Sequence, residues 1–374
     1  MGSLIYADNA ATTQLDKDAL DAMLPFLKEE FGNASGVYSF ARSPKKAITE
    51  ARQIIANCIN AMPDEIIFTS GGTEGDNWAI KGVALKYQNK GRHIITSAIE
   101  HHAVLHSCAF LEDLNYKITY LPVDNKGHLS IETLRGALRS DTTLVSIMLA
   151  NNEIGTIQNI RGFSEVVHKE KILFHCDAVQ AIGHISVDVK TLDVDMLSAS
   201  AHKFNGPKGI GFMYLKKGTD LYKWSSGGKQ ESGQRAGTEN VASIVGMAMA
   251  LKTNVDNIYE NTAYLDRLSD EFFNKLSNSG VDFLVNGDSN RLPGNINISI
   301  KNQDGEALMH RLDLKGIIVS TGSACSSGKS DLSHVIKAIG TPKEYAAGTI
   351  RITLSKDNTT DHVLAIAEAI ASII

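Results

Sequence analysis

The chain has 374 residues, a length that favours two domains or one large α/β domain with an addition. Apolar residues make up 43% and charged residues 21%, which excludes a disordered chain. The net charge of -5 gives no general attraction to nucleic acid or an anionic membrane, and no stretch reaches the roughly 18 apolar residues of a membrane span. We therefore expect a cytoplasmic protein that binds small molecules or other proteins and neither nucleic acid nor membranes.

The first strong pattern is an alternation of short apolar runs with amphipathic segments between about residues 65 and 215. Strands are predicted at 65–69, 93–96, 143–149, 172–175, 194–197 and 210–214. Strands separated by helical segments predict a mostly parallel sheet covered on both faces. Ligands of such sheets bind at the carboxyl ends of the strands.

The pattern changes in the second half of the chain. A helix is predicted from 247 to 258, because apolar residues recur there every three to four positions. Segments 295–300 and 349–354 alternate with period two, which predicts a smaller α+β domain with a half-exposed antiparallel sheet. We place the boundary near 250, with residues 15–250 in the large domain and residues 1–14 and 251–374 in the small domain.

Four cysteines, Cys58, Cys108, Cys176 and Cys325, are scattered without a C-x-x-C pair. This spacing argues against a disulfide framework and against a zinc, cluster or redox-cysteine site. We expect no bound metal. At least one of these thiols is a candidate for a chemical role.

A candidate anion site follows the strand that ends near Ser70. Gly71 and Gly72 precede Thr73, after which helical periodicity resumes. Glycines let the backbone approach an anion and a helix N-terminus favours negative charge, so this segment is a candidate phosphate site. Taken alone, the same residues fit an ordinary helix N-cap equally well.

Two further segments contain polar groups at strand ends. Asp177 follows the strand at 172–175, and Gln180 lies one helical turn later; an ordinary N-cap is the alternative for Asp177. Lys203, between His202 and a Gly-Pro turn, is a candidate for a desolvated amine that forms a Schiff base, although most lysines are solvated. A phosphate site, an acid and this lysine are the groups that pyridoxal 5'-phosphate (PLP) requires.

These segments resemble the class-V aminotransferases of PLP fold type I, and in particular the cysteine desulfurases that supply iron-sulfur cluster assembly. The resemblance implies an α/β fold in which the large domain has a mostly parallel seven-stranded sheet and the smaller C-terminal domain is α+β. It extends over essentially the whole chain, in segments that follow the family's order: 6–13, 100–104, 150–155, 177–180, 200–209, 235–240, 323–326 and 349–351.

The resemblance also implies roles at the cofactor. Lys203 would form the Schiff base and move the proton of the substrate Cα, Asp177 would keep the ring nitrogen protonated, and Gln180 would bond the phenolic oxygen. His101 would stack on the ring and act as an acid or base, which is compatible with capping the helix that begins there. The phosphate would be bound by a set from both subunits of a homodimer: Gly72, Thr73, Ser200, His202 and the partner subunit's Thr238.

The remaining roles concern the substrate, L-cysteine. Arg351 would bind its carboxylate with help from Asn152, although on sequence alone Arg351 fits an exposed strand position as well. Cys325 lies in the small, polar segment 320–331, whereas the other three cysteines have apolar or helical neighbours. The resemblance implies that Cys325 accepts the substrate sulfur as a persulfide and passes it to an acceptor such as an iron-sulfur scaffold protein.

Three positions depart from the family pattern. Tyr38 stands where a histidine is usual, Gln14 replaces a proline and Ser232 replaces an arginine, which leaves substrate preference and partner choice less defined than the chemistry. A selenocysteine lyase or a small-amino-acid aminotransferase is the alternative within PLP enzymes, and the aminotransferase would not need the thiol. A catalytically silent scaffold or PLP-binding regulator is the alternative outside them, disfavoured by the complete residue set.

Overall fold

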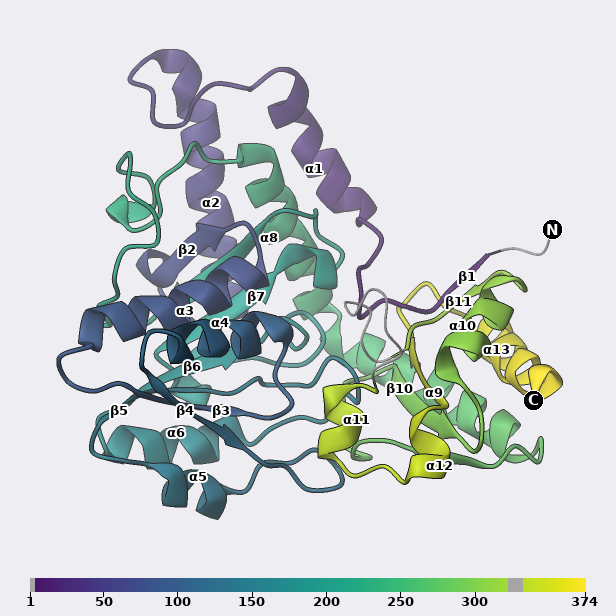
Figure 1. The fold of residues 1–374 in the computed structure, drawn as a ribbon. Helices are drawn as coiled ribbons and strands as arrows, with labels where there is room; N and C mark the ends of the chain where they lie inside the picture. The colour runs from purple at the N-terminus through teal and green to yellow at the C-terminus, as the bar shows by residue number, and fades with distance from the viewer. Residues whose placement is uncertain (1–3, 322–331) are drawn as a thin grey trace.

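Seven strands form one sheet in the order β2-β8-β7-β6-β5-β3-β4 (Figure 1). The computed structural model describes residues 4–321 and 332–374. Strand β8 runs antiparallel to both β2 and β7, and the remaining neighbours pair in parallel. The strands are β2 (Ile66–Thr69), β3 (His93–Ser97), β4 (Lys117–Leu121), β5 (Thr142–Ser146), β6 (Leu173–Asp177), β7 (Met196–Ser200) and β8 (Gly211–Leu215).

This arrangement confirms the predicted sheet, with one strand that the sequence patterns missed. Strand β4 lies at the sheet edge and four of its five residues are at least partly exposed, so it lacks the continuous apolar run of its neighbours. The other parallel strands are buried on both faces, which is why they are almost uniformly apolar or small.

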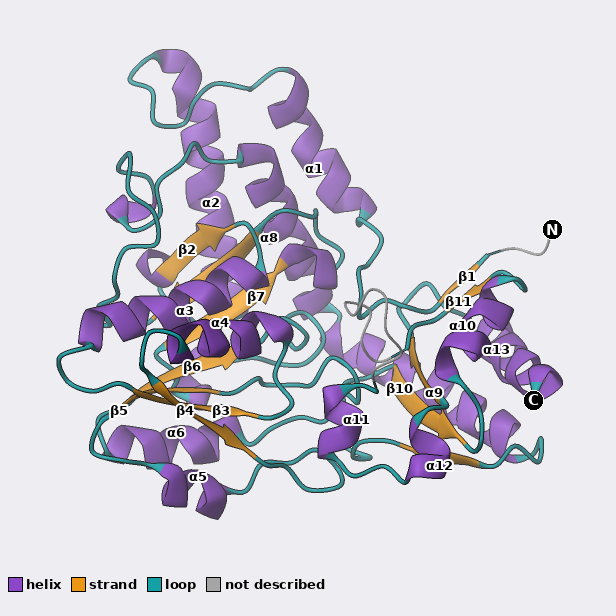
Figure 2. Ribbon diagram, in the orientation of Figure 1, coloured by secondary structure: helices purple, strands orange, loops and turns teal. Residues whose placement is uncertain are grey.

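Helices cover both faces of this sheet (Figure 2). On one face α3 and α4 pack against apolar side chains of the strands, and on the other face α2, α6 and α8 do so. The helices of this part are α1 (Lys17–Lys28), α2 (Arg42–Cys58), α3 (Gly72–Tyr87), α4 (His102–Glu112), α5 (Ile131–Ala137), α6 (Ile160–Lys169), α7 (Val189–Leu192) and α8 (Val241–Asp256). Four short 3-10 turns are η1 (Ser39–Ala41), η2 (Pro63–Glu65), η3 (Ala201–Lys203) and η4 (Glu231–Gly233).

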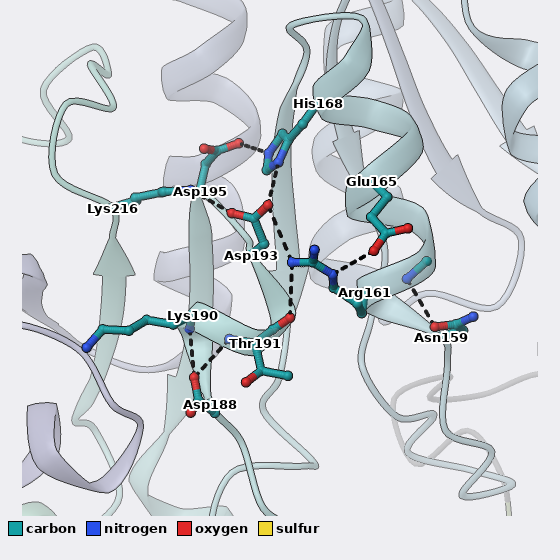
Figure 3. Close-up of polar contacts among 11 residues, drawn as sticks. Asn159, Arg161, Glu165, His168, Asp188, Lys190, Thr191, Asp193, Asp195 and Lys216 are labelled. Atoms are coloured by element: carbon teal, nitrogen blue, oxygen red, sulfur yellow. Dashed lines mark hydrogen bonds and ion pairs between the residues drawn. The ribbon is translucent and has the colours of Figure 1, made fainter.

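A polar network fixes the end of α6 to the loop before β7 (Figure 3). His168 Nε2 lies 3.0 Å from Asp195 Oδ2, and His168 Nδ1 lies 3.3 Å from Asp193 Oδ2. Hydrogen bonding to Asp195 raises the pKa of His168, so the protonated ring is favoured. Lys216 also pairs with Asp193, with its Nζ 2.8 Å from Asp193 Oδ1. None of these residues lines the cavity described below, so we assign the network to the fold.

The C-terminal part has its own three-stranded antiparallel sheet, in the order β12-β10-β9. The N-terminal strand β1 pairs in parallel with β11, which places the start of the chain beside this part (Figure 1). The strands are β1 (Ile5–Tyr6), β9 (Phe283–Val285), β10 (Asn295–Ile300), β11 (Ile317–Ile318) and β12 (Thr349–Thr353). The helices are α9 (Ile258–Ser277), α10 (Gly305–Asp313), α11 (His334–Ala338), α12 (Lys343–Ala346) and α13 (Thr360–Ile373).

One sequence prediction about this part is wrong. The sheet is not half exposed, because every residue of β10 and β12 is buried. Its polar face meets polar groups of the larger part: Asn297 Nδ2 donates to the Glu153 carbonyl at 3.2 Å. The helix predicted from 247 to 258 is confirmed as part of α8, although α8 ends at Asp256 and Ile258 begins α9.

Two of the four apolar clusters among the described residues support a division into two domains. The larger core includes Leu251 of α8, and the smaller core includes Leu265 and Leu268 of α9. The predicted boundary is near 250, with 15–250 in the large domain and 1–14 and 251–374 in the small domain. Because Leu251 packs in the larger core, we propose that the large domain continues to the end of α8 at Asp256. Among the helices of the described residues, none is long and apolar enough to cross a membrane.

Candidate functional site

A cavity of about 360 Å³ lies at the carboxyl ends of the parallel strands, between the two parts of the chain. This is the position expected for the ligand of such a sheet. Ten of the residues singled out from the sequence line it: Gly72, Thr73, His101, Asn152, Asp177, Gln180, Ser200, His202, Lys203 and Arg351. Thr238 is exposed and is not among the lining residues, and Cys325 lies outside the described residues.

One end of the cavity joins a hollow suited to an anion. Helix α3 begins there with Gly71 as its N-cap, and its φ of 149° is one that a side-chain-bearing residue rarely adopts. A Cβ on Gly72 would lie 2.3 Å from Val179 Cγ2, so the glycine permits close packing of the helix start. Side chains that can donate hydrogen bonds surround the hollow: Thr12, Ser70, Thr73, Ser200, His202 and Lys208. Open helix amides and these donors suit a phosphate group.

Lys203 and Gln180 converge on the same backbone from different elements. Lys203, at the end of η3, donates from Nζ to the carbonyls of Ala10 and Ala11 at 2.6 and 2.8 Å. Gln180 Nε2 donates to the Ala10 carbonyl at 2.9 Å. The N-terminal segment that resembles the family's opening motif therefore holds both side chains at the cavity.

Asp177 ends β6 beneath the cavity. Its Oδ1 accepts a hydrogen bond from the Val179 amide at 2.9 Å. Asp177 therefore caps the local backbone and also lines the cavity. Burial raises the pKa of Asp177 to about 6, and the Val179 amide and Lys203 oppose this rise. Asp177 is therefore mainly a carboxylate at neutral pH.

His101 is the N-cap of α4, as the sequence allowed. Its Nδ1 accepts a hydrogen bond from the Ala103 amide at 3.1 Å, which assigns the ring proton to Nε2. Burial lowers the pKa of His101 to about 4, and the charge of Lys203 adds to this effect. The ring is neutral at pH 7 and retains an N–H donor at Nε2.

Arg351 is buried, so the alternative of an exposed strand position is wrong. It is 3% exposed; its Nη2 donates to Asp8 Oδ1 at 2.8 Å and its Nη1 donates to the Asn152 carbonyl at 3.0 Å. The buried Nε has no hydrogen-bond partner among the described residues. A buried guanidinium with an unused donor beside a cavity suits a ligand carboxylate.

Several lining residues were missed by the sequence analysis. Asp76 follows Thr73 by three residues on the same helix, a spacing that would have placed both on one face. Glu153 accepts a 2.6 Å hydrogen bond from Ser333, the N-cap of α11, and burial raises its pKa to about 7. His334 and Met148 also line the cavity, and no local sequence signal points to either.

The three described cysteines are free thiols that do not line the cavity. Burial raises the pKa of Cys58 to about 11 and that of Cys108 to about 12, and it raises the pKa of Cys176 as well. None of the three is a favourable thiolate. Within residues 4–321 and 332–374, no group of three or more possible side-chain ligands could hold a metal ion.

The sequence and the fold match those of a known class of protein. Residues 5–366 match the family model of aminotransferase class-V, and the chain belongs to this family. The cysteine desulfurase IscS of Dictyoglomus turgidum is 53% identical over 351 residues, which are 94% of this chain and 89% of that protein. A solved NifS-like protein has a TM-score of 0.94 and 38% identity, covering 99% of both chains. A solved structure of SspA in complex with cysteine has a TM-score of 0.85 and 36% identity, covering 95% of this chain and all of that one.

Enzymes of this class depend on PLP, and the groups around the cavity fit that cofactor. The hollow at the start of α3 suits its phosphate, and the Asp177 carboxylate suits a protonated ring nitrogen. Lys203 lines the same cavity, with an amine that can bond the carbonyl carbon of PLP. The unused Nε of Arg351 remains for the carboxylate of a substrate.

Proposed function

We propose that this protein is a cysteine desulfurase that converts L-cysteine to L-alanine and leaves the sulfur as a persulfide on Cys325. The observation that supports it most strongly is the convergence of Lys203, Asp177 and the unused Nε of Arg351 on one cavity. The similar protein of Dictyoglomus turgidum has this activity by name, and the similar SspA binds cysteine.

Bound PLP would supply a conjugated, electron-withdrawing ring that stabilises negative charge at the substrate Cα. Asp177 would hold the ring nitrogen through its charge, and Thr73, Ser200 and His202 would hold the phosphate. Gln180, already oriented by the Ala10 carbonyl, would bond the phenolic oxygen. These residues would hold the cofactor, and Lys203 would bond its carbonyl carbon.

Two side chains would handle protons beside the substrate. Lys203 Nζ would take the proton of Cα and return it to the substrate carbon skeleton. His101, neutral in its buried position, would present its ring face to the cofactor and its Nε2–H to the substrate. Arg351 would fix the substrate carboxylate and thereby aim the Cα–H bond at Lys203.

Cys325 would perform the sulfur transfer. Its thiolate attacks the substrate sulfur, an S–S bond forms and the Cβ–S bond breaks. Protons return to the former substrate as alanine leaves, so L-cysteine and one thiol become L-alanine and one persulfide. The three described thiols have raised pKa values and lie away from the cavity, which supports the fourth cysteine as the acceptor.

The proposed function is tested by incubating the purified protein with PLP and L-cysteine. We expect alanine in the solution and a protein whose mass increases by one sulfur atom, with the increase located on the peptide that contains Cys325. Formation of a keto acid without a persulfide would instead identify an aminotransferase. Absence of any reaction with PLP bound would identify a silent PLP-binding protein.

Replacing Arg351 with lysine is expected to raise the KM for L-cysteine by roughly 30-fold or more, the factor that corresponds to about 2 kcal/mol for a buried charged contact. Lysine keeps a positive charge beside Asp8 but loses the planar fork and Nε. Steady-state kinetics measures the change. R311K, at an exposed arginine that bonds the Ile373 carbonyl, is the matched control and should leave KM unchanged. An unaltered KM in R351K would contradict this role.

We also propose that the enzyme is a homodimer in which the partner subunit's Thr238 completes the phosphate site. The segment between α1 and α2 exposes large apolar side chains: Phe31, Val37, Tyr38 and Phe40 are 73%, 105%, 51% and 47% exposed. Exposed apolar surface of this kind marks a protein-protein contact. The same segment adjoins the loop that contains Thr238, since Ser35 and Glu239 line one groove together with Ser232.

Replacing Val37 with aspartate is expected to raise the dimer dissociation constant about tenfold or more, because a charge would enter an apolar contact. Val37 is fully exposed in the single chain, so the fold itself loses no contact. Sedimentation at several concentrations measures the change. L314D, at an equally apolar residue that is 89% exposed on the small domain, is the matched control. A wild-type chain that sediments as a monomer would refute the dimer.

We propose that an iron-sulfur scaffold protein receives the sulfur from Cys325. We also propose that this transfer takes place in the cytoplasm. The three described cysteines are free thiols, which suits a reducing compartment.

Tyr38 and Ser232, which depart from the family pattern, lie at the proposed dimer surface rather than at the cavity. Gln14 lies close to the site, where its carbonyl accepts a hydrogen bond from Asn205.

A further inference from the structure

A second carboxyl group, Asp76, lies beside Asp177 at the base of the cavity. Asp76 belongs to the first turns of α3, lines the cavity and is 1% exposed. Its Oδ1 is buried and has no hydrogen-bond partner among the described residues. A buried carboxylate without a compensating partner is strongly disfavoured, so the charge of this group needs an explanation.

A hydrogen bond from Ser198 lowers the pKa of Asp76, but this hydroxyl is neutral and brings no compensating charge. The basic side chain of His175 lies close to Asp76, with its Nε2 at 3.6 Å from Asp76 Oδ1. Both ring nitrogens of His175 lie 2.9 Å from serine hydroxyls, Nδ1 from Ser146 and Nε2 from Ser198, and the ring is completely buried. Burial lowers the pKa of His175 to about 3, so this ring is neutral.

The other charged groups around Asp76 also disfavour its ionisation. Asp177 from β6 and Glu100 from the segment before α4 are acidic, and both raise the pKa of Asp76 in addition to burial. Asp177 differs from Asp76 because it has the Val179 amide and the charge of Lys203 to stabilise its ionised form. When two neighbouring carboxyl groups cannot both ionise, the less well compensated one keeps the proton.

We propose that Asp76 is a neutral, protonated positioning residue. The pair of Asp76 and Asp177 then carries one negative charge, and this charge is on Asp177, the group proposed to hold the cofactor ring. Asp76 thereby acts on the cofactor through Asp177. If Asp76 were charged, its negative charge would raise the pKa of Asp177 and favour protonation of Asp177. A neutral Asp76 avoids this effect. The statement about the ring rests on the proposed function, whereas the proton on Asp76 does not.

The proton is tested by counting protons released when the cofactor-free full-length protein is denatured at pH 7.5. An unfolded aspartate has an ordinary pKa near 4 and is ionised, so a protonated folded Asp76 must release its proton on unfolding. We expect the wild type to release about one proton more per chain than D76N. The variant D177N loses the neighbouring charge that helps to raise the pKa of Asp76, so we expect it to release no more protons than the wild type. Glu100 and Glu153 also have raised pKa values, and a neutral Asp76 leaves their contributions the same in the wild type and in D76N. The charge of Asp177 raises the pKa of Glu100, so the comparison of the wild type with D76N is the decisive one.

The effect on the cofactor is a second measurement. D76N should bind PLP with an affinity close to that of the wild type, since an amide has the size and neutrality of the acid. D177N should bind it roughly tenfold more weakly or worse, because a charge-assisted hydrogen bond is lost.

Equal proton release by the wild type and D76N would overturn the proposal, as would a D76N protein that fails to fold or loses PLP as D177N does. Failure of the proposed function has a different signature. A wild type that binds no PLP, or makes no alanine, would leave the proton count unchanged.

Discussion

Replacing Lys203 with alanine is expected to lower the rate of alanine formation by on the order of 10²–10⁴-fold, the contribution typical of a positioned acid-base group. The variant should also bind PLP more weakly, because the amine that bonds the cofactor is gone. Assays at saturating PLP separate the two effects. Addition of a small primary amine should restore part of the activity, since it supplies the proton acceptor that the side chain no longer provides.

The control for this experiment is K217A. Lys217 lies on the surface beyond β8, pairs with Asp64 and should be dispensable. A K203A protein with undiminished turnover would mean that another group takes the proton of Cα, and the assignment of Lys203 would then fail together with the proposed function.

Replacing Cys325 with alanine is expected to abolish alanine formation from L-cysteine while the absorbance of bound PLP stays the same. The substitution removes the thiol that accepts sulfur and leaves every described residue of the cavity in place. Mass spectrometry should find no persulfide on this variant.

C58A is the matched variant for the cysteine experiment. Cys58 is a partly exposed free thiol whose pKa is raised to about 11, far from a reactive thiolate. C58A should form alanine and persulfide as the wild type does. Loss of sulfur transfer in C58A, with transfer retained in C325A, would reverse the assignment of the acceptor.

Much of the fold could be predicted because the evidence for it is local in the chain. The strands β5, β6 and β8 are short apolar or small-residue runs bounded by turn signals, and such runs indicate a sheet buried on both faces. Strand β4 was missed because an exposed edge strand needs no apolar run. The domains, the roles of the site residues and the partner subunit's Thr238 stay predictions.

The burial and charge of the site residues could not be predicted, because they depend on distant segments. Arg351 fits an exposed strand position by sequence, yet Asp8, far away in the chain, pairs with it in the interior. The polar residues of β10 suggest a solvated face, yet that face packs on Glu153.

The sequence by itself therefore determined the sheet type, the small and large sheets and the set of residues with the chemistry for PLP, since spacing and residue type are sufficient for these. Only the tertiary structure decided which of those residues are buried together and which of them are charged. A carboxyl such as Asp76 ionises or stays neutral according to the groups that pack around it, and those groups come from α3, β6 and the segment before α4.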